Sequence, residues 1–216
     1  MPPSRALRPA AATAAGTEED EEPAAFAAAL ADLEAGIVRL RDTRLEVKFE
    51  PQPPPRRLAP RAAAVAATVE LNGREIGWGR FVLLYDPAGQ EGWNGPFRVI
   101  AYIRAELEPE IAADPLIGQV GWSWLTEALQ ARSAAFAEPS GTVTRVVTEG
   151  FGTKHGEPVA TEFEMRASWS PAGPGEAAEM SRHVSAWADA LCTASGLPPV
   201  PPGVAPLRPS RPRRRT

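Results

Sequence analysis

Three glutamates at alternate positions, Glu106, Glu108 and Glu110, form the only carboxylate cluster in the central part of the chain. In a strand, residues two apart point to the same face, so the three carboxylates could bind Mg²⁺ or share a proton. Alternatively, a helix begins near Pro109 and places the acids at its solvated N-terminus, where the helix dipole favours negative charge. We favour the helix, because no histidine and no second acidic motif lies nearby in the sequence.

The loop 86–95, with the sequence DPAGQEGWNG, is the segment that we expect to contact a ligand or a partner protein. Loops carry many binding residues, and Trp93, Gln90 and Glu91 offer an aromatic surface and hydrogen-bonding groups. The loop lacks the lysine and the hydroxyl residue of a phosphate-binding P-loop. The alternative is a purely structural hairpin connection made of two turns.

Two tryptophans surround a serine in the run from Gly121 to Leu125, GWSWL. The run matches only part of the G-x-S-x-G nucleophile elbow, because Leu125 replaces the last glycine and no strand leads directly into it. We therefore expect Ser123 to be an N-terminal residue of a helix. On a helix, Trp122 and Trp124 diverge by roughly 200°, so one ring packs inside and Trp124 is predicted to lie at an interface.

The histidines and the cysteine do not suggest a metal site. His155 lies in a predicted hairpin tip, and His183 lies on the last predicted helix without a cysteine or histidine at ligand spacing. Cys192 is the only cysteine, which excludes an intrachain disulfide and fits a reducing compartment. We expect it to be a buried thiol. With no complete catalytic set, we predict no catalytic residue and no cofactor, and we favour a protein that is not an enzyme.

Hydrophobic periodicity predicts the elements that carry these residues. Apolar residues three and four apart predict three helices, from Phe26 to Ile37, from Trp122 to Phe136 and from Met180 to Leu191. Alternating patterns and one run that is apolar on both faces predict six strands, within residues 45–50, 65–71, 75–86, 97–105, 142–150 and 159–169. The order is helix, four strands, helix, two strands and helix. Because the strands do not alternate with helices, we predict an α+β fold with an antiparallel sheet of about six strands.

Some of these strands make sharper predictions about packing. The strand 159–169 should point four side chains into the core: Val159, Phe163, Met165 and Trp169. Asn72-Gly73 predicts a hairpin turn between two strands. The glycines of Gly77-Trp-Gly79 lie inside a strand and indicate a close approach of the backbone to a neighbour.

The two ends of the chain differ from its middle. We predict a disordered acidic arm over residues 1–25, one domain over residues 26–197, and a disordered Pro/Arg-rich tail over residues 198–216. The formal net charge is −4 although the tail holds five arginines. The acidic middle therefore argues against a nucleic-acid groove and leaves only weak contacts through the tail. Without a signal peptide or an apolar run of membrane length, we predict a cytoplasmic protein that does not span a membrane.

Several runs of residues resemble a known family. The runs GRFVLLYDPAGQEGWNGPFRVIAYIRAELEPEIAADP, VGWSWLTEAL, PSGTVTRVVTEGFG and RASWSP are similar, in this order, to an actinobacterial family known as domain of unknown function number three thousand. The resemblance covers approximately Phe26 to Trp187. It implies an actinobacterial host and a cytoplasmic protein, and it brings no activity, cofactor or catalytic residue.

A second resemblance concerns the order of the elements alone. The order of helices and strands is similar to that in secretion-chaperone-like domains, which bind extended peptides and often dimerise. This chain has four early strands, whereas that pattern has three. We therefore favour a non-enzymatic adaptor or chaperone-like module that binds another protein or a second copy of itself. The alternative is a small-ligand or divalent-metal-dependent enzyme that uses Glu106, Glu108 and Glu110.

Overall fold

The computed structural model describes residues 10–11, 23–172 and 179–197 and shows an α+β fold. A seven-stranded antiparallel sheet has the order β1-β3-β4-β5-β7-β6, with β2 paired to β3 on the same side as β1. In chain order, the elements are β1 (Ala10–Ala11), α1 (Ala24–Thr43), β2 (Val47–Gln52), β3 (Arg61–Leu71), β4 (Arg74–Tyr85), β5 (Phe97–Glu106), α2 (Pro109–Ala112), α3 (Ile117–Ala131), β6 (Phe136–Thr148), η1 (Gly152–Lys154), β7 (Ala160–Pro171) and α4 (Met180–Ala194).

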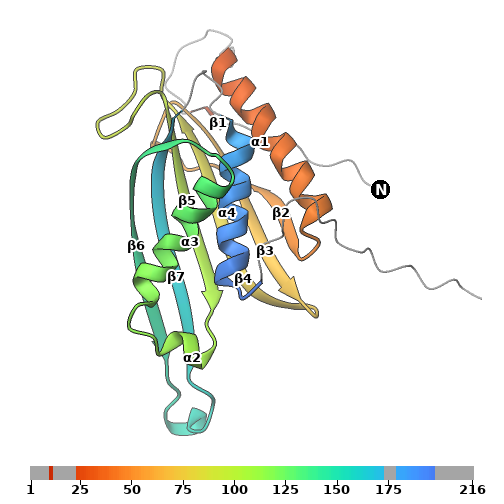
Figure 1. Cartoon of the computed structure of the whole chain (residues 1–216), viewed down its shortest axis with the longest axis vertical. Coiled ribbons are helices and arrows are strands. Elements are labelled where there is room, and N and C mark those ends of the chain that lie inside the picture. Colours follow the sequence, from red (N-terminus) through yellow and green to blue (C-terminus); the bar gives the residue numbers. More distant parts are fainter. Residues whose placement is uncertain (1–9, 12–22, 173–178, 198–216) are drawn as a thin grey trace, which may run out of the picture.

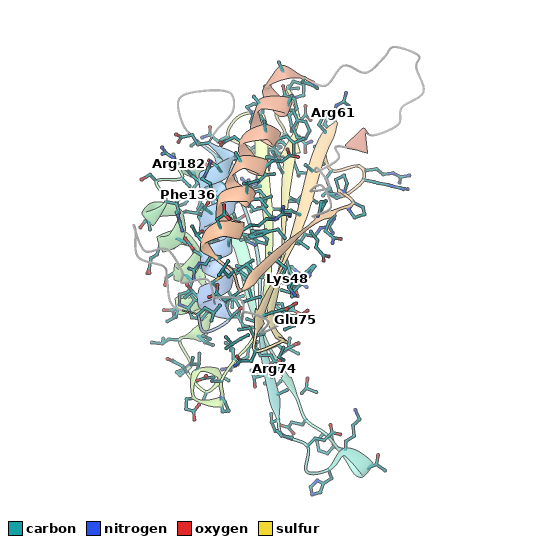
Figure 2. The ribbon with its side chains drawn as sticks, turned by 90° about the vertical axis from the view of Figure 1, so that its right-hand side faces the viewer. Lys48, Arg61, Arg74, Glu75, Phe136 and Arg182 are labelled. Carbon is teal, nitrogen blue, oxygen red and sulfur yellow. The ribbon has the colours of Figure 1, made fainter. Side chains whose placement is uncertain are left out.

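The three long helices α1, α3 and α4 cover one face of the sheet, with α4 between the other two (Figure 1). Figure 2, turned by 90°, shows the helices on one side of the strands and side chains without a helical cover on the other side. This is the predicted fold class, with the predicted order of long elements. None of the described helices has the length and apolar composition needed to span a membrane.

Helix α4 forms the centre of the core. Its residues Met180, Val184, Trp187 and Leu191 are fully buried, as their helical spacing predicts. The sheet approaches this helix closely where it has no side chain: a Cβ on Gly79 would lie 2.8 Å from Cζ2 of Trp187. The close approach predicted for the glycine pair in β4 is therefore confirmed.

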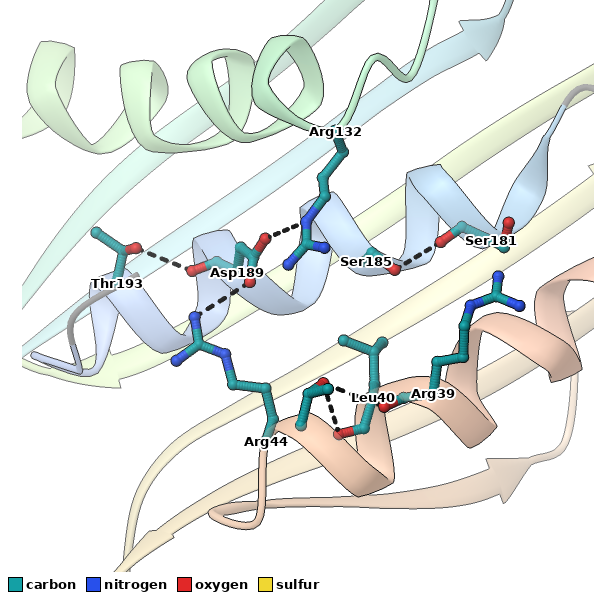
Figure 3. Close-up of polar contacts among 9 residues, drawn as sticks. Arg39, Leu40, Arg44, Arg132, Ser181, Ser185, Asp189 and Thr193 are labelled. Atoms are coloured by element: carbon teal, nitrogen blue, oxygen red, sulfur yellow. Dashed lines mark hydrogen bonds and ion pairs between the residues drawn. The ribbon is translucent and has the colours of Figure 1, made fainter. Parts of the chain in front are cut away.

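One half-buried carboxylate joins the three long helices (Figure 3). Asp189 on α4 accepts hydrogen bonds from Arg44, which follows α1, at 3.1 Å and from Arg132, which follows α3, at 2.6 Å. Arg44 is only 3% exposed, and a buried cation requires such a partner. This contact fixes the ends of two outer helices against the central one.

The β-hairpin predicted at Asn72-Gly73 is also confirmed. Both residues have positive φ angles, 53° and 79°, the combination that a two-residue type I′ turn requires. The turn sets the register in which β4 becomes a central strand between β3 and β5.

Four predicted positions are wrong, and each error concerns where an element begins or ends. Leu45 lies in the turn before β2 and is 43% exposed, because α1 extends to Thr43. Phe136 begins β6, because α3 already ends at Ala131. Val159 precedes β7 and is 56% exposed, since the β6–β7 hairpin reaches beyond the helical layer (Figure 1). Ser123 lies inside α3 instead of at its start.

The predicted arm over residues 1–25 falls partly outside the described residues. Within it, Ala10–Ala11 form β1, which pairs with β3 at Arg61 and Ala62, and Ala24 already belongs to α1. The predicted tail over residues 198–216 lies wholly outside the described part of the chain.

Candidate functional site

The face of the sheet opposite the helices, called here the open face, carries two adjoining grooves. Their volumes are about 510 and 480 Å³, which lies within the range of ligand pockets in proteins. Leu58 and Ile100 line both grooves. The loop 53–60, which joins β2 to β3, therefore forms a common wall, and β5 forms a common floor.

The register of the sheet explains which side chains meet on this face. Across β4, β5 and β7, Arg80 stands opposite Tyr102, which stands opposite Arg166. Two residues further along the strands, Val82 stands opposite Ile100. Side chains two apart point to the same face, so a row with two arginines and one tyrosine lies beside an apolar row.

The first groove, called here the Trp78 groove, combines this apolar row with aromatic rings and cations. The rings of Trp78 and Tyr102 lie 5.7 Å apart between centroids. Arg166 lies over the Tyr102 ring, 5.5 Å from its centroid, and donates a hydrogen bond to Glu164 at 3.1 Å. Burial and a hydrogen bond with Glu164 raise the pKa of Tyr102 above its ordinary value, so its hydroxyl stays protonated at neutral pH.

Among the described residues, Arg80 of this groove has only a neutral partner. Its Nη2 donates a hydrogen bond to the carbonyl oxygen of Pro53 at 2.6 Å. Its Nε is buried and has no hydrogen-bond partner among the described residues. Of the described residues that line the Trp78 groove, Arg80 and Arg166 are charged and none is acidic.

The second groove, called here the Trp93 groove, is lined by the three loop residues that the sequence singles out. Trp93, Gln90 and Glu91 all lie in its wall. Gln90 donates hydrogen bonds to the carbonyl oxygen of Leu58 at 3.1 Å and to the Asp86 carboxylate at 3.0 Å. These bonds connect the loop after β4 with the loop 53–60, and they hold the wall shared by the two grooves.

Trp93 is half-buried, because its ring packs on a small apolar cluster of the open face. The cluster consists of Ala62, Ala64, Val82 and Leu84. The loop therefore has two roles: it covers part of the open face, and it leaves polar groups of Gln90 and Glu91 at the surface.

Arg98 closes the bottom of the Trp93 groove and was not singled out from the sequence. It is 8% exposed, and it donates hydrogen bonds to the hydroxyls of Ser168 at 2.8 Å, Ser170 at 3.2 Å and Ser140 at 3.3 Å. Burial lowers the pKa of Arg98 from its ordinary value, while the negative charge of Glu138 acts in the opposite direction. The serines come from β6 and β7, so only the sheet register could reveal this cluster.

The fourth residue predicted to contact a partner, Trp124, lies apart from the grooves. It is on α3, on the helical side of the sheet, and its ring packs 5.4 Å from the ring of Phe163. The structure brings Trp93, Gln90 and Glu91 together and separates Trp124 from them.

The three glutamates of the possible acidic site do not share a strand face. Strand β5 ends at Glu106, whose carboxylate accepts a hydrogen bond from Arg74 at 2.8 Å. Glu108 is the N-cap residue of α2, and Glu110 lies in its first turn, as the helical alternative predicts. Within residues 10–11, 23–172 and 179–197, no group of three or more His, Cys, Asp or Glu residues could hold a metal ion.

Comparison with known proteins gives one match over most of the chain. A family model described as "Protein of unknown function (DUF3000)" matches residues 22–205. The chain belongs to this family. The match confirms the resemblance found in the sequence, and it includes both grooves as well as the helices α1, α3 and α4. No curated protein and no solved structure matches the chain.

The remaining candidate groups lie away from the open face. His183 on α4 is 1% exposed, and its Nδ1 accepts a hydrogen bond from Nε1 of Trp169 at 3.1 Å. Burial and the charge of Arg182 lower the pKa of His183 to about 4, so the ring is neutral at pH 7. Because Nδ1 is an acceptor, the proton of the neutral ring is on Nε2.

Cys192 and His155 have opposite environments. Cys192 is fully buried, as predicted, and burial raises the pKa of its thiol to about 12, so it has little nucleophilic character. His155 is exposed at the tip of the β6–β7 hairpin, where the sequence predicts it.

Proposed function

We propose that this chain is a non-enzymatic module that binds an extended segment of another protein along the open face of its sheet. The observation that carries the proposal is the pair of adjoining grooves, which have a shared wall at Leu58 and a shared apolar floor at Ile100. Apolar clefts with a few convergent polar groups are the common form of binding sites. An apolar face rimmed by polar residues is also typical of interaction surfaces.

The spacing of the side-chain rows on the open face supports an extended occupant. Successive side chains on one face of a strand are about 6.5–7 Å apart. An extended segment that lies along the direction of β4 and β5 has the same spacing between alternate side chains. These side chains therefore meet successive rows of the open face. Val82 and Ile100 would then contact an apolar side chain, and Trp93 would contact the next part of the segment.

The cellular setting of this proposal comes from the sequence. A cytoplasmic setting in an actinobacterial host agrees with the family resemblance, and an adaptor or chaperone-like role agrees with the order of the elements. The cytoplasmic setting also agrees with a single cysteine that is buried in the fold.

A displayed library of random peptides tests the proposal directly. The full chain is immobilised, and the enriched peptides are synthesised and measured by fluorescence anisotropy. The proposal predicts that Leu58→Gln weakens their binding, because Leu58 lines both grooves and is 45% exposed, so its substitution leaves the fold intact. The matched control is Leu116→Gln, a residue that is 53% exposed next to α3. Equal binding by both variants contradicts the proposal, and so does the absence of enriched peptides.

A second copy of the chain is the competing occupant of the open face. Sedimentation velocity over a range of protein concentrations distinguishes the two. A dimer that dissociates in the Leu58→Gln variant and persists in the Leu116→Gln variant would assign the open face to self-association and overturn the proposal of a separate partner.

A further inference from the structure

We infer that the Trp78 groove selects segments in which an acidic residue lies two positions from an apolar residue. This inference rests on the proposed function. In this inference, a carboxylate of the bound segment pairs with Arg80, while the apolar side chain packs on Val82 and Ile100.

The geometry of the sheet gives the spacing. Arg80 and Arg166 belong to one row across the strands, on either side of Tyr102, and Val82 and Ile100 belong to the next row. Neighbouring rows on one face are two residues apart, about 6.5–7 Å. Two side chains at positions i and i+2 of an extended segment have this separation, so one can reach Arg80 while the other reaches the apolar floor.

The charge of the groove gives the chemistry. Among the described residues that line it there are two arginines and no acid. One of the two, Arg166, is already paired with Glu164 beside the groove. The guanidinium of Arg80 donates to a neutral carbonyl, and its buried Nε has no hydrogen-bond partner among these residues. A cation in a partly apolar environment is unfavourable without an anion, and a guanidinium binds a carboxylate through two parallel hydrogen bonds.

Two exposed arginines of β4 and β5, Arg74 and Arg104, provide a contrast. Arg104 donates to Glu75 at 3.2 Å, and Arg74 donates to Glu106 at 2.8 Å. These cations have carboxylate partners within the chain, whereas Arg80 has none in the described residues. The anion missing at Arg80 is the one that a bound acidic residue supplies.

The experiment uses the full chain and peptides enriched from the random library. Each peptide is compared with a version in which its acidic residue is replaced by the corresponding amide, Asp→Asn or Glu→Gln. We expect the amide to bind the unmodified chain about tenfold more weakly, since a hydrogen bond between a guanidinium and a carboxylate is roughly twice as strong as one to a neutral acceptor. In Arg80→Gln the two peptides should bind within about twofold of each other, and Arg80→Lys should restore part of the preference.

The control is Arg104→Gln, which removes an equal charge from the same face but outside the lining of the Trp78 groove. It should leave the preference for the acidic peptide intact. If Arg104→Gln reduces the preference as much as Arg80→Gln does, the effect is a general one of net charge, and the inference is wrong.

The two proposals fail in different ways. Enriched peptides that bind at Leu58 but show no preference for an acid overturn this inference and leave the proposed function standing. A library that yields no binding peptide contradicts the proposed function and, with it, the inference.

Discussion

At the scale of single residues, substitutions of two tryptophans, Trp169 and Trp93, test the fold and the site together. Trp169 is 1% exposed, packs edge-on to Phe81 and donates to His183, whereas Trp93 lies half-buried on the open face. Trp169→Ala should lower the free energy of unfolding by about 3–5 kcal/mol. Trp93→Ala should lower it by about 1 kcal/mol, because only part of the ring loses contact. Urea unfolding of both variants measures this, and equal losses would contradict the placement of Trp93.

His183 predicts how stability depends on pH. Its pKa is about 4 in the folded chain and about 6.5 when unfolded, so between these values the unfolded chain binds the extra proton. Its contribution to stability is therefore complete above pH 6.5 and is lost as the pH falls towards 4. From pH 7 to pH 4.5 the loss should be about 2–3 kcal/mol.

The control for this prediction is His183→Asn, which cannot titrate and can still accept a hydrogen bond from Trp169. Denaturant melts at both pH values should show a smaller loss in this variant than in the unmodified chain. The same loss in both would assign the pH dependence to other groups. Arg182 and Asp32, which act on His183 with opposite sign, are present in both proteins.

The position of a residue could be predicted from the sequence where it depends on the pattern within a single strand or a single loop. Phe163, Met165 and Trp169 point inward as alternation predicts, and Trp93 shares a groove with its loop neighbours. The roles of Arg80 and Arg98 could not be predicted in the same way. Their partners Pro53, Ser140 and Ser168 are far away in the sequence, and they meet only through strand pairing.

At the scale of elements, the packing of α1 on α4 depends on one glycine. A Cβ at Gly36 would lie 2.8 Å from Cα of Ser181 and 2.8 Å from Cγ1 of Val184. Replacing a glycine inside a helix by alanine normally stabilises a protein by about 0.5–1 kcal/mol. At Gly36 the sign should reverse, because the methyl group would push the two helices apart at a fully packed contact.

Gly118 in α3 gives a matched control, since a Cβ there meets nothing within 4 Å among the described residues. Gly118→Ala should raise the midpoint of thermal unfolding and Gly36→Ala should lower it. A rise in both would show that α1 and α4 are not in close contact at this position.

The existence and order of the long elements could be predicted from the sequence, because each has a strong period of its own. The ends could not. Leu45 continues the alternation of β2 but lies in a turn, and Phe136 continues the spacing of α3 but begins a strand. In both cases the pattern runs past the point where packing against neighbouring elements ends the helix or begins the strand.

At the scale of the whole molecule, the two faces of the sheet have different roles. One face is covered by α1, α3 and α4, which Asp189 joins at its two arginines (Figure 3). The other face has no helix over it in the described part of the chain (Figure 2). This open face carries both grooves. The family match covers every described helix and strand of this two-layer unit except β1. The proposed partner binds on the uncovered face.

The most direct measurement places a photo-reactive benzoylphenylalanine on each face in turn. The full chain carries it in place of Leu58 on the open face, or in place of Leu116 or Val38 on the helical side, where both residues are more than half exposed. After irradiation with a labelled peptide from the library, mass spectrometry detects the crosslink. Binding along the open face predicts crosslinking at position 58, suppressed by unlabelled peptide, and none at 116 or 38. Crosslinking at 116 or 38 with none at 58 would contradict it.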